Sequence, residues 1–152
     1  MQNLNTVAVV LASGSGERFG RTQTPKHLTP LLGVPTLVWT VNTILKSKLF
    51  SAVVVVTSAR NISITERTLA KYFNEIGLSI FITEGSTSRT KSFNLGFANL
   101  IDWKLVDKSS IVALFDANRP FVQTSQLLEL YKAMESHACA CPARPLVNGV
   151  AI

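Results

Sequence analysis

A continuous apolar run near the N-terminus leads directly into a long glycine-rich loop, and this junction constrains the fold more than any other stretch. Residues 6–12 are mostly valine, leucine and alanine, which is typical of a strand buried on both faces of a parallel sheet. The loop that follows, residues 11–27, holds three glycines, three fixed cations and one acid: Gly14, Gly16, Gly20, Arg18, Arg21, Lys26 and Glu17. We expect such a loop to bind an anion, because backbone N–H groups can approach a phosphate closely where no Cβ intervenes.

The rest of the chain alternates predicted strands with predicted helices. Further strands are expected at residues 52–56, 79–83, 111–115 and 138–141, and helices at about residues 35–46, 63–76, 89–101 and 125–137. Ser63 and Glu66 fit the capping-box pattern and would open the second helix. Strict alternation predicts an α/β, Rossmann-like fold of three layers, with a mainly parallel sheet and helices on both faces.

Three polar loops each follow a predicted strand. They are the glycine-rich loop, a loop around Gly85 and the turn that begins at Asp116. Ligands of open parallel sheets bind outside the carboxyl ends of the strands. The order of elements therefore predicts that all three loops meet at one edge of the sheet and form a site there.

Composition limits the class of protein. The 152 residues fit one domain, 47% of them are hydrophobic, and the net charge of +6 favours anionic partners. Lysine and arginine are scattered rather than clustered with aromatic residues, so we do not expect a nucleic-acid binder. No run has the length of a membrane span or the pattern of a secretory signal, and we expect a cytoplasmic protein with no membrane partner. Cys139 and Cys141 are expected to be buried free thiols.

Two common phosphate-binding motifs are tested first. A P-loop fails because the chain has no Gly-Lys pair. A dinucleotide fingerprint needs G-x-G-x-x-G, and Gly14, Gly16 and Gly20 are spaced one residue too widely. Arg60, after the second strand, would suit a 2′-phosphate, so an NADP-binding module stays as an alternative.

Three segments in order carry a family resemblance. The stretch Leu-Ala-Ser-Gly-x-Gly-x-Arg-Phe-Gly from Leu11, followed by Pro25-Lys26-His27, resembles the signature of sugar-phosphate nucleotidyltransferases. Residues 84–92 with Leu95-Gly96 resemble the G-x-x-x-R-x-x-S-x-x-x-G segment of cytidylyltransferases, and residues 116–121 resemble their D-A-A-R-P-F turn. Together they resemble the family of 2-C-methyl-D-erythritol 4-phosphate and ribitol-5-phosphate cytidylyltransferases.

The resemblance implies an activity and a set of site residues. The family transfers CMP from CTP to a polyol phosphate, releases pyrophosphate and uses Mg²⁺. Arg18 and Lys26 match the cations that stabilise the transition state, and Asp116 matches the carboxylate that helps to hold Mg²⁺. The positions that match the nucleotide-binding residues are Leu11, Ala12, Ser13, Gly14, Gly16, Gly85, Ser86, Thr87, Ser92 and Ala117. Arg119 is expected to be a buried, structural arginine of the turn that pairs with a carboxylate or with carbonyls. His27 is expected to form a hydrogen bond within its loop.

The chain departs from the family pattern in three ways. Asn118 replaces a small apolar residue, Ser86 stands where glycine is common, and the match fades after Pro142. The chain also stops at Ile152, short of a full family domain, so we expect a C-terminal part to be missing, either from a fragment or from a truncated relative. The full-length form is expected to be a homodimer. A non-catalytic CTP-binding module is the second functional hypothesis.

Overall fold

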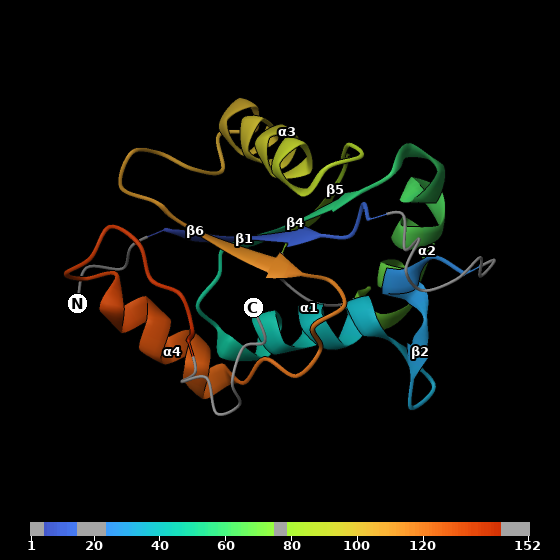
Figure 1. The fold of residues 1–152 in the computed structure, drawn as a ribbon, viewed down its shortest axis with the longest axis horizontal. Coiled ribbons are helices and arrows are strands. Elements are labelled where there is room, and N and C mark those ends of the chain that lie inside the picture. The colour runs from blue at the N-terminus through green and yellow to red at the C-terminus, as the bar shows by residue number, and fades with distance from the viewer. Residues whose placement is uncertain (1–4, 15–23, 75–78, 144–152) are drawn as a thin grey trace, which may run out of the picture.

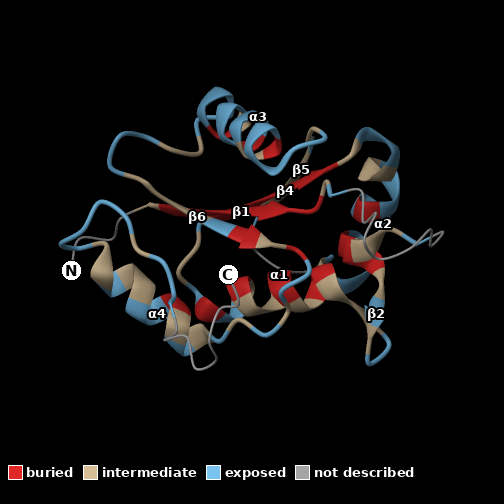
Figure 2. Cartoon of the chain, viewed as in Figure 1, coloured by how far each residue is buried: buried red, intermediate tan, exposed pale blue. Residues whose placement is uncertain are grey.

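Four parallel strands form the centre of the molecule in a computed structural model that describes residues 5–14, 24–74 and 79–143 (Figure 1). The strands are β1 (Thr6–Leu11), β4 (Ala52–Thr57), β5 (Ser79–Glu84) and β6 (Ile111–Asp116). Their order in the sheet is β5-β4-β1-β6, and every neighbouring pair is parallel. The two central strands are buried along their whole length (Figure 2), which explains their unbroken apolar sequences.

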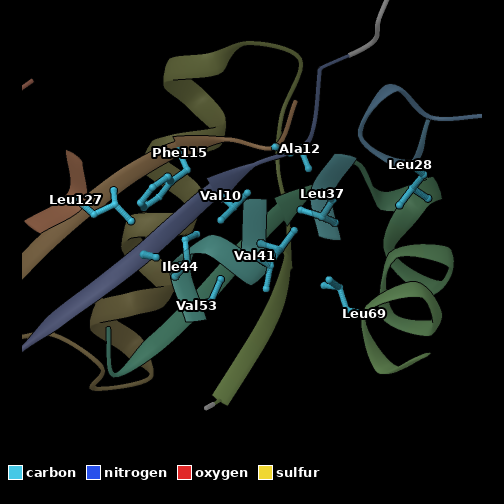
Figure 3. Packing of buried hydrophobic residues seen from close by; sticks show 13 residues of the cluster. Val10, Ala12, Leu28, Leu37, Val41, Ile44, Val53, Leu69, Phe115 and Leu127 are labelled. Carbon is cyan, nitrogen blue, oxygen red and sulfur yellow. The ribbon is translucent and has the colours of Figure 1, made fainter. Parts of the chain in front are cut away.

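Helices cover both faces of this sheet. Helix α3 (Arg89–Asp102) lies on one face, and α1 (Thr36–Ser47), α2 (Ile62–Phe73) and α4 (Thr124–Ala133) lie on the other (Figure 1). Side chains of β1 alternate between the two layers: Val7 and Val9 belong to the cluster under α3, whereas Ala8 and Val10 belong to the larger cluster on the opposite face (Figure 3). The predicted three-layer α/β architecture is confirmed.

A short hairpin follows the glycine-rich loop. A 3-10 turn, η2 (Lys26–Leu28), leads into β2 (Pro30–Leu31) and β3 (Val34–Pro35), which are antiparallel. The two linking residues have positive φ, +52° at Leu32 and +78° at Gly33, as a tight two-residue turn requires. The Trp39 indole donates a hydrogen bond of 3.0 Å to the Leu31 carbonyl, which ties the hairpin to α1.

Several local predictions were wrong. Helix α2 begins at Ile62 after the 3-10 turn η3 (Ala59–Asn61), with Asn61 as its N-cap, so Ser63 already lies in the helix and the Ser63–Glu66 capping box does not form. The predicted end of this helix at residue 76 lies outside the described residues. Helix α4 stops at Ala133, and residues 138–141 are irregular rather than a strand. Both cysteines are exposed instead of buried.

No helix in the described ranges is long and apolar enough to cross a membrane.

Candidate functional site

The register of the sheet places the three predicted loops side by side. Leu11, the last residue of β1, pairs with Val56 of β4 on one side and with Asp116 of β6 on the other. The adjacent β4 residue, Thr57, pairs with Glu84 at the end of β5. The predicted convergence at one edge of the sheet is therefore confirmed for the described parts of these loops.

Backbone hydrogen bonds continue the sheet into each loop. The Ala12 N–H donates to the Val56 carbonyl at 2.7 Å, and the Gly85 N–H donates to the Thr57 carbonyl at 2.7 Å. The Ala117 N–H donates to the Leu11 carbonyl at 3.0 Å. These bonds fix the first residue of each loop, and Ala12, Gly85 and Ala117 lie where the resemblance expects nucleotide contacts.

The glycine-rich loop is described only at its two ends. Leu11 and Ala12 are buried, Ser13 is half-buried and Gly14 is exposed, so the polypeptide emerges from the core at Ser13. Gly16 and Arg18 lie outside the described residues, and their predicted roles stay predictions.

Gly85 is glycine because two loops touch at this point. A Cβ on Gly85 would lie 2.8 Å from Val56 Cγ1 and 2.9 Å from Ser13 Cβ, closer than side chains pack. Its backbone therefore rests directly on the glycine-rich loop. The next two residues differ in exposure, since Ser86 is half-buried and Thr87 is exposed.

Ser92, a buried residue of α3, contacts both of these loops. It lies in the first turn of α3, is 0% exposed, and its Oγ is 2.7 Å from Ser13 Oγ. The structure thus places the buried Ser92 hydroxyl within hydrogen-bond distance of both the glycine-rich loop, at Ser13, and the loop around Gly85, at the Ser86 nitrogen.

Asp116 is held between two arginines. Arg89 Nε, at the start of α3, lies 3.2 Å from one carboxylate oxygen, and Arg119 Nε lies 3.0 Å from the other. The Asp116 side chain is 19% exposed, while those of Arg89 and Arg119 are 62% and 76% exposed. The predicted pairing of Arg119 with a carboxylate is confirmed, but the expectation that it is buried was wrong, because its side chain is 76% exposed and its guanidinium group lies at the surface of the edge.

The donor set at this edge fits a magnesium ion that is shared with a substrate. Among the described residues, no group of three or more His, Cys, Asp or Glu side chains could hold a metal ion. Mg²⁺, however, is commonly bound by one or two carboxylates together with substrate phosphates and water. Each oxygen of Asp116 contacts one arginine and has a second lone pair, so either oxygen could still coordinate a metal ion.

Lys26 is anchored to the same end of the molecule through α1. Thr36, the first residue of α1, donates its hydroxyl to the carbonyl oxygens of Lys26 and His27 at 3.4 and 3.0 Å. One turn later, the Thr40 hydroxyl is 3.2 Å from the carbonyl of Ala117. The first two turns of α1 therefore link the Lys26 segment to the Asp116 turn.

These two threonines were missed in the sequence. Thr40 is 2% exposed, and it interrupts the apolar face of a helix. A buried hydroxyl on such a face needs a partner, and that requirement is the signal that could have identified it.

His27 does not form the hydrogen bond within its loop that was predicted. Its Nε2 is 3.1 Å from the Thr65 hydroxyl of α2, so its partner lies outside the loop. The ring is 3% exposed, and loss of solvation on burial lowers the pKa of His27 from 6.5 to about 4. The residue is thus neutral at physiological pH and serves the packing of the Lys26 segment.

Comparisons with known proteins identify the family of this chain. The sequence model of the family described as 2-C-methyl-D-erythritol 4-phosphate cytidylyltransferase matches residues 6–151. A D-ribitol-5-phosphate cytidylyltransferase of Xenopus tropicalis is 30% identical over 98% of this chain and 36% of its own length. The human protein of that name is 30% identical over 94% of this chain and 32% of its own length.

A solved structure shares the fold. The 4-diphosphocytidyl-2C-methyl-D-erythritol synthase from Anaerococcus prevotii superposes with a TM-score of 0.67 at 23% identity, over 89% of this chain and 53% of that one. Compared with the two D-ribitol-5-phosphate cytidylyltransferases, the chain spans about a third of their length. Because the family match covers nearly all of its residues, the chain belongs to the 2-C-methyl-D-erythritol 4-phosphate cytidylyltransferase family.

Proposed function

We propose that this chain carries the CTP-binding part of a cytidylyltransferase, which transfers CMP from CTP to a polyol phosphate and releases pyrophosphate. The observation that supports this most strongly is the meeting of the three family segments at one sheet edge, held by the backbone bonds of Ala12, Gly85 and Ala117. Family membership supports the nucleotide and the reaction class.

In this proposal an oxygen of the acceptor phosphate attacks the α-phosphorus of CTP, and pyrophosphate leaves. Negative charge accumulates on the transferred group, so catalysis consists mainly of positioning and charge stabilisation. Lys26 and Arg18 supply fixed positive charge to this group. Removal of one such group is expected to lower the rate by about 10²–10³.

Asp116 would hold Mg²⁺ together with phosphate oxygens of the nucleotide. A bound Mg²⁺ would neutralise phosphate charge and orient the phosphates. Arg89 and Arg119 flank this carboxylate, and each contacts it through Nε of a guanidinium group that has five N–H donors. The two arginines would therefore add positive charge beside the phosphates while they orient Asp116.

The acceptor is proposed as a class. The relatives are named for D-ribitol 5-phosphate or for 2-C-methyl-D-erythritol 4-phosphate, and both are polyol phosphates. We also propose a cytoplasmic location, which the two exposed, unpaired cysteines support, because exposed thiols persist in a reducing compartment. For the full-length form we propose a homodimer, with the family resemblance as support.

A pyrophosphate-release assay tests the activity. The chain is mixed with CTP, Mg²⁺ and either ribitol 5-phosphate or 2-C-methyl-D-erythritol 4-phosphate, and Lys26→Ala is compared with the wild type. Lys46→Ala is the matched control, because Lys46 is exposed in the last turn of α1. The proposal predicts turnover with one acceptor, a 10²–10³-fold loss in Lys26→Ala and no loss in Lys46→Ala.

The other outcomes separate the alternatives. Binding of CTP with no turnover on either acceptor would support a non-catalytic CTP-binding module. Tighter binding of NADP than of CTP would contradict the proposal and support the NADP-binding module instead.

A further inference from the structure

The buried hydroxyl of Thr40 in α1 lies within reach of two carbonyl groups. Thr40 is 2% exposed, and its Oγ1 lies 3.2 Å from the Ala117 carbonyl oxygen and 3.3 Å from the Thr36 carbonyl oxygen. A carbonyl group can only accept a hydrogen bond, so Thr40 is the donor in either contact. The hydroxyl therefore gives its proton to the Asp116 turn, to its own helix, or to both in a three-centre bond.

The Ala117 carbonyl needs this hydroxyl more than the Thr36 carbonyl does. Within α1, the Thr36 carbonyl also faces the backbone N–H of Thr40, four residues later, as in any α-helix. Ala117 is 1% exposed, and among the described residues no other donor contacts its carbonyl. A buried carbonyl without a partner is costly, so the bond from Thr40 is the one that satisfies Ala117.

Ala117 fixes the backbone of the Asp116 turn from two sides. Its N–H donates to the Leu11 carbonyl of β1 at 3.0 Å, while its carbonyl accepts from Thr40 of α1. The Arg119 N–H closes the turn by donating to the Asp116 carbonyl at 3.1 Å. The chain that leaves β6 passes alongside α1 (Figure 1), so the Asp116 carboxylate is carried by a turn that is attached both to the sheet and to this helix.

The same part of α1 holds the Lys26 segment. The Thr36 hydroxyl donates to the His27 carbonyl at 3.0 Å and lies 3.4 Å from the Lys26 carbonyl. Thr36 and Thr40 are four residues apart, so they lie on one face of the helix, one turn from each other. The first two turns of α1 therefore set the position of Lys26 relative to Asp116.

We propose that Thr40 is a positioning residue for cytidylyl transfer: by donating to the Ala117 carbonyl, it holds the Asp116 turn in a fixed place relative to Lys26. Thr40 touches neither the nucleotide nor the metal ion. The role rests on the proposed function, in which Mg²⁺ at Asp116 and the charge of Lys26 act on the phosphates of one nucleotide. Small displacements between such groups lower the rate, because the transition state is stabilised only where both are in place.

Removal of the Thr40 hydroxyl at nearly constant shape tests this role. Thr40→Val keeps the β-branched side chain and deletes the donor. In pyrophosphate release by the full chain with CTP, Mg²⁺ and a polyol phosphate, kcat should fall about five- to tenfold, the effect of one neutral hydrogen bond. The KM for CTP at saturating Mg²⁺ should stay within about twofold, and the half-saturating Mg²⁺ concentration should rise about fivefold. Thr40→Ser, which restores the hydroxyl, should recover kcat to within about twofold of the wild type.

Thr43→Val is the matched control in the same helix. The Thr43 hydroxyl donates to the Trp39 carbonyl at 3.3 Å, the same contact within the helix that Thr40 makes with Thr36. Among the described residues, it has no hydrogen bond outside α1. Thr43→Val should therefore leave kcat, KM and the Mg²⁺ requirement within about twofold of the wild type. Thr40→Ala compared with Thr43→Ala serves in the same way if Thr40→Val does not fold.

Amide hydrogen exchange measures the same link without substrate. The Ala117 and Arg119 amides both lie in the Asp116 turn and donate backbone hydrogen bonds there, whereas Val54 lies in the buried strand β4. In Thr40→Val the two turn amides should exchange about fivefold faster relative to the Val54 amide. Thr43→Val should leave this ratio unchanged.

Several results would overturn the inference. Equal losses of kcat in Thr40→Val and Thr43→Val would show an effect on the helix rather than on the Asp116 turn. An unchanged Mg²⁺ requirement in Thr40→Val would show that the metal ligand had not moved. Exchange that rises as much at Val54 as at Ala117 would reduce the role of Thr40 to global stability. Absence of turnover in the wild type would instead contradict the proposed function, and an unchanged exchange ratio in Thr40→Val would then refute the link itself.

Discussion

The buried histidine beside Lys26 makes stability depend on pH. His27 is 3% exposed, and burial lowers its pKa from 6.5 to about 4. Between these two values the unfolded chain binds a proton that the folded chain does not. The free energy of unfolding is therefore fully retained above about pH 6.5 and falls as the pH drops toward 4.

The size of the effect follows from the shift. A shift of one pKa unit corresponds to about 1.4 kcal/mol. For the shift of His27 to about 4, the linkage relation gives a loss of about 2 kcal/mol between pH 7 and pH 5. This interval lies above the ordinary pKa values of aspartate and glutamate, so carboxylates add little to it.

Replacement with glutamine isolates this contribution. His27→Gln removes the titrating ring and retains a group that can pair with the Thr65 hydroxyl. Urea unfolding at pH 7, 6 and 5, followed by circular dichroism, should show a loss of about 2 kcal/mol in the wild type and almost none in His27→Gln. His137→Gln is the control at an exposed histidine, and it should behave like the wild type. An equal loss in the wild type and His27→Gln would refute the reasoning.

Three further substitutions test the site. Gly85→Ala should lower the free energy of unfolding by about 1–3 kcal/mol, because its Cβ would lie 2.8 Å from Val56 Cγ1. A Cβ on Gly14 would meet no atom of the described residues within 4 Å, so Gly14→Ala should leave the free energy of unfolding unchanged. Equal effects of the two substitutions in urea unfolding would contradict the packing argument. Thr57→Val should raise the melting temperature and add about 1 kcal/mol to the free energy of unfolding, because the Thr57 hydroxyl is buried with no hydrogen-bond partner in the described part of the chain. A loss of stability would show that the hydroxyl has a partner. Asp116→Asn should abolish the gain in CTP affinity on addition of Mg²⁺. It should change the free energy of unfolding by less than about 1 kcal/mol, because the two arginines that pair with Asp116 are exposed. A preserved Mg²⁺ effect in calorimetry would exclude Asp116 as the metal ligand.

Much of the fold could be predicted because its core strands carry unambiguous patterns. The central strands β1 and β4 are unbroken apolar runs, and a run of that length between turn residues suits a strand buried on both faces. Alternation with helices then determines a parallel sheet, and the carboxyl-end rule gathers the loops that contain Ser13, Gly85 and Asp116.

The errors arose where a local pattern competes with its neighbours. Ser63 and Glu66 have capping-box spacing, yet η3 starts the helical path earlier and places Ser63 inside α2. The apolar stretch at residues 138–141 resembles a strand, but a strand needs a neighbour to pair with, and sequence pattern alone does not show whether one is present.

The site was predicted at the level of residue types rather than bonds. The sequence correctly predicted that the loops before Ser92 and at Asp116 lie beside the glycine-rich loop. The spacing of residues does not show whether a given side chain faces a ligand or the protein interior. Ser92 is fully buried against Ser13, and Asp116 is already paired with two arginines. His27 was missed as a packing residue because its partner, Thr65, is 38 residues away in the sequence.

Nucleotide selectivity in a thermal-shift experiment tests the central claim most directly. The chain is heated with Mg²⁺ and a saturating concentration of CTP, ATP, GTP or NADP in turn. A ligand present at a hundred times its dissociation constant adds about 2.7 kcal/mol to the free energy of unfolding. We predict a rise in melting temperature with CTP well above that with the other three. No rise with CTP, or an equal rise with all four, would contradict a CTP site at this edge.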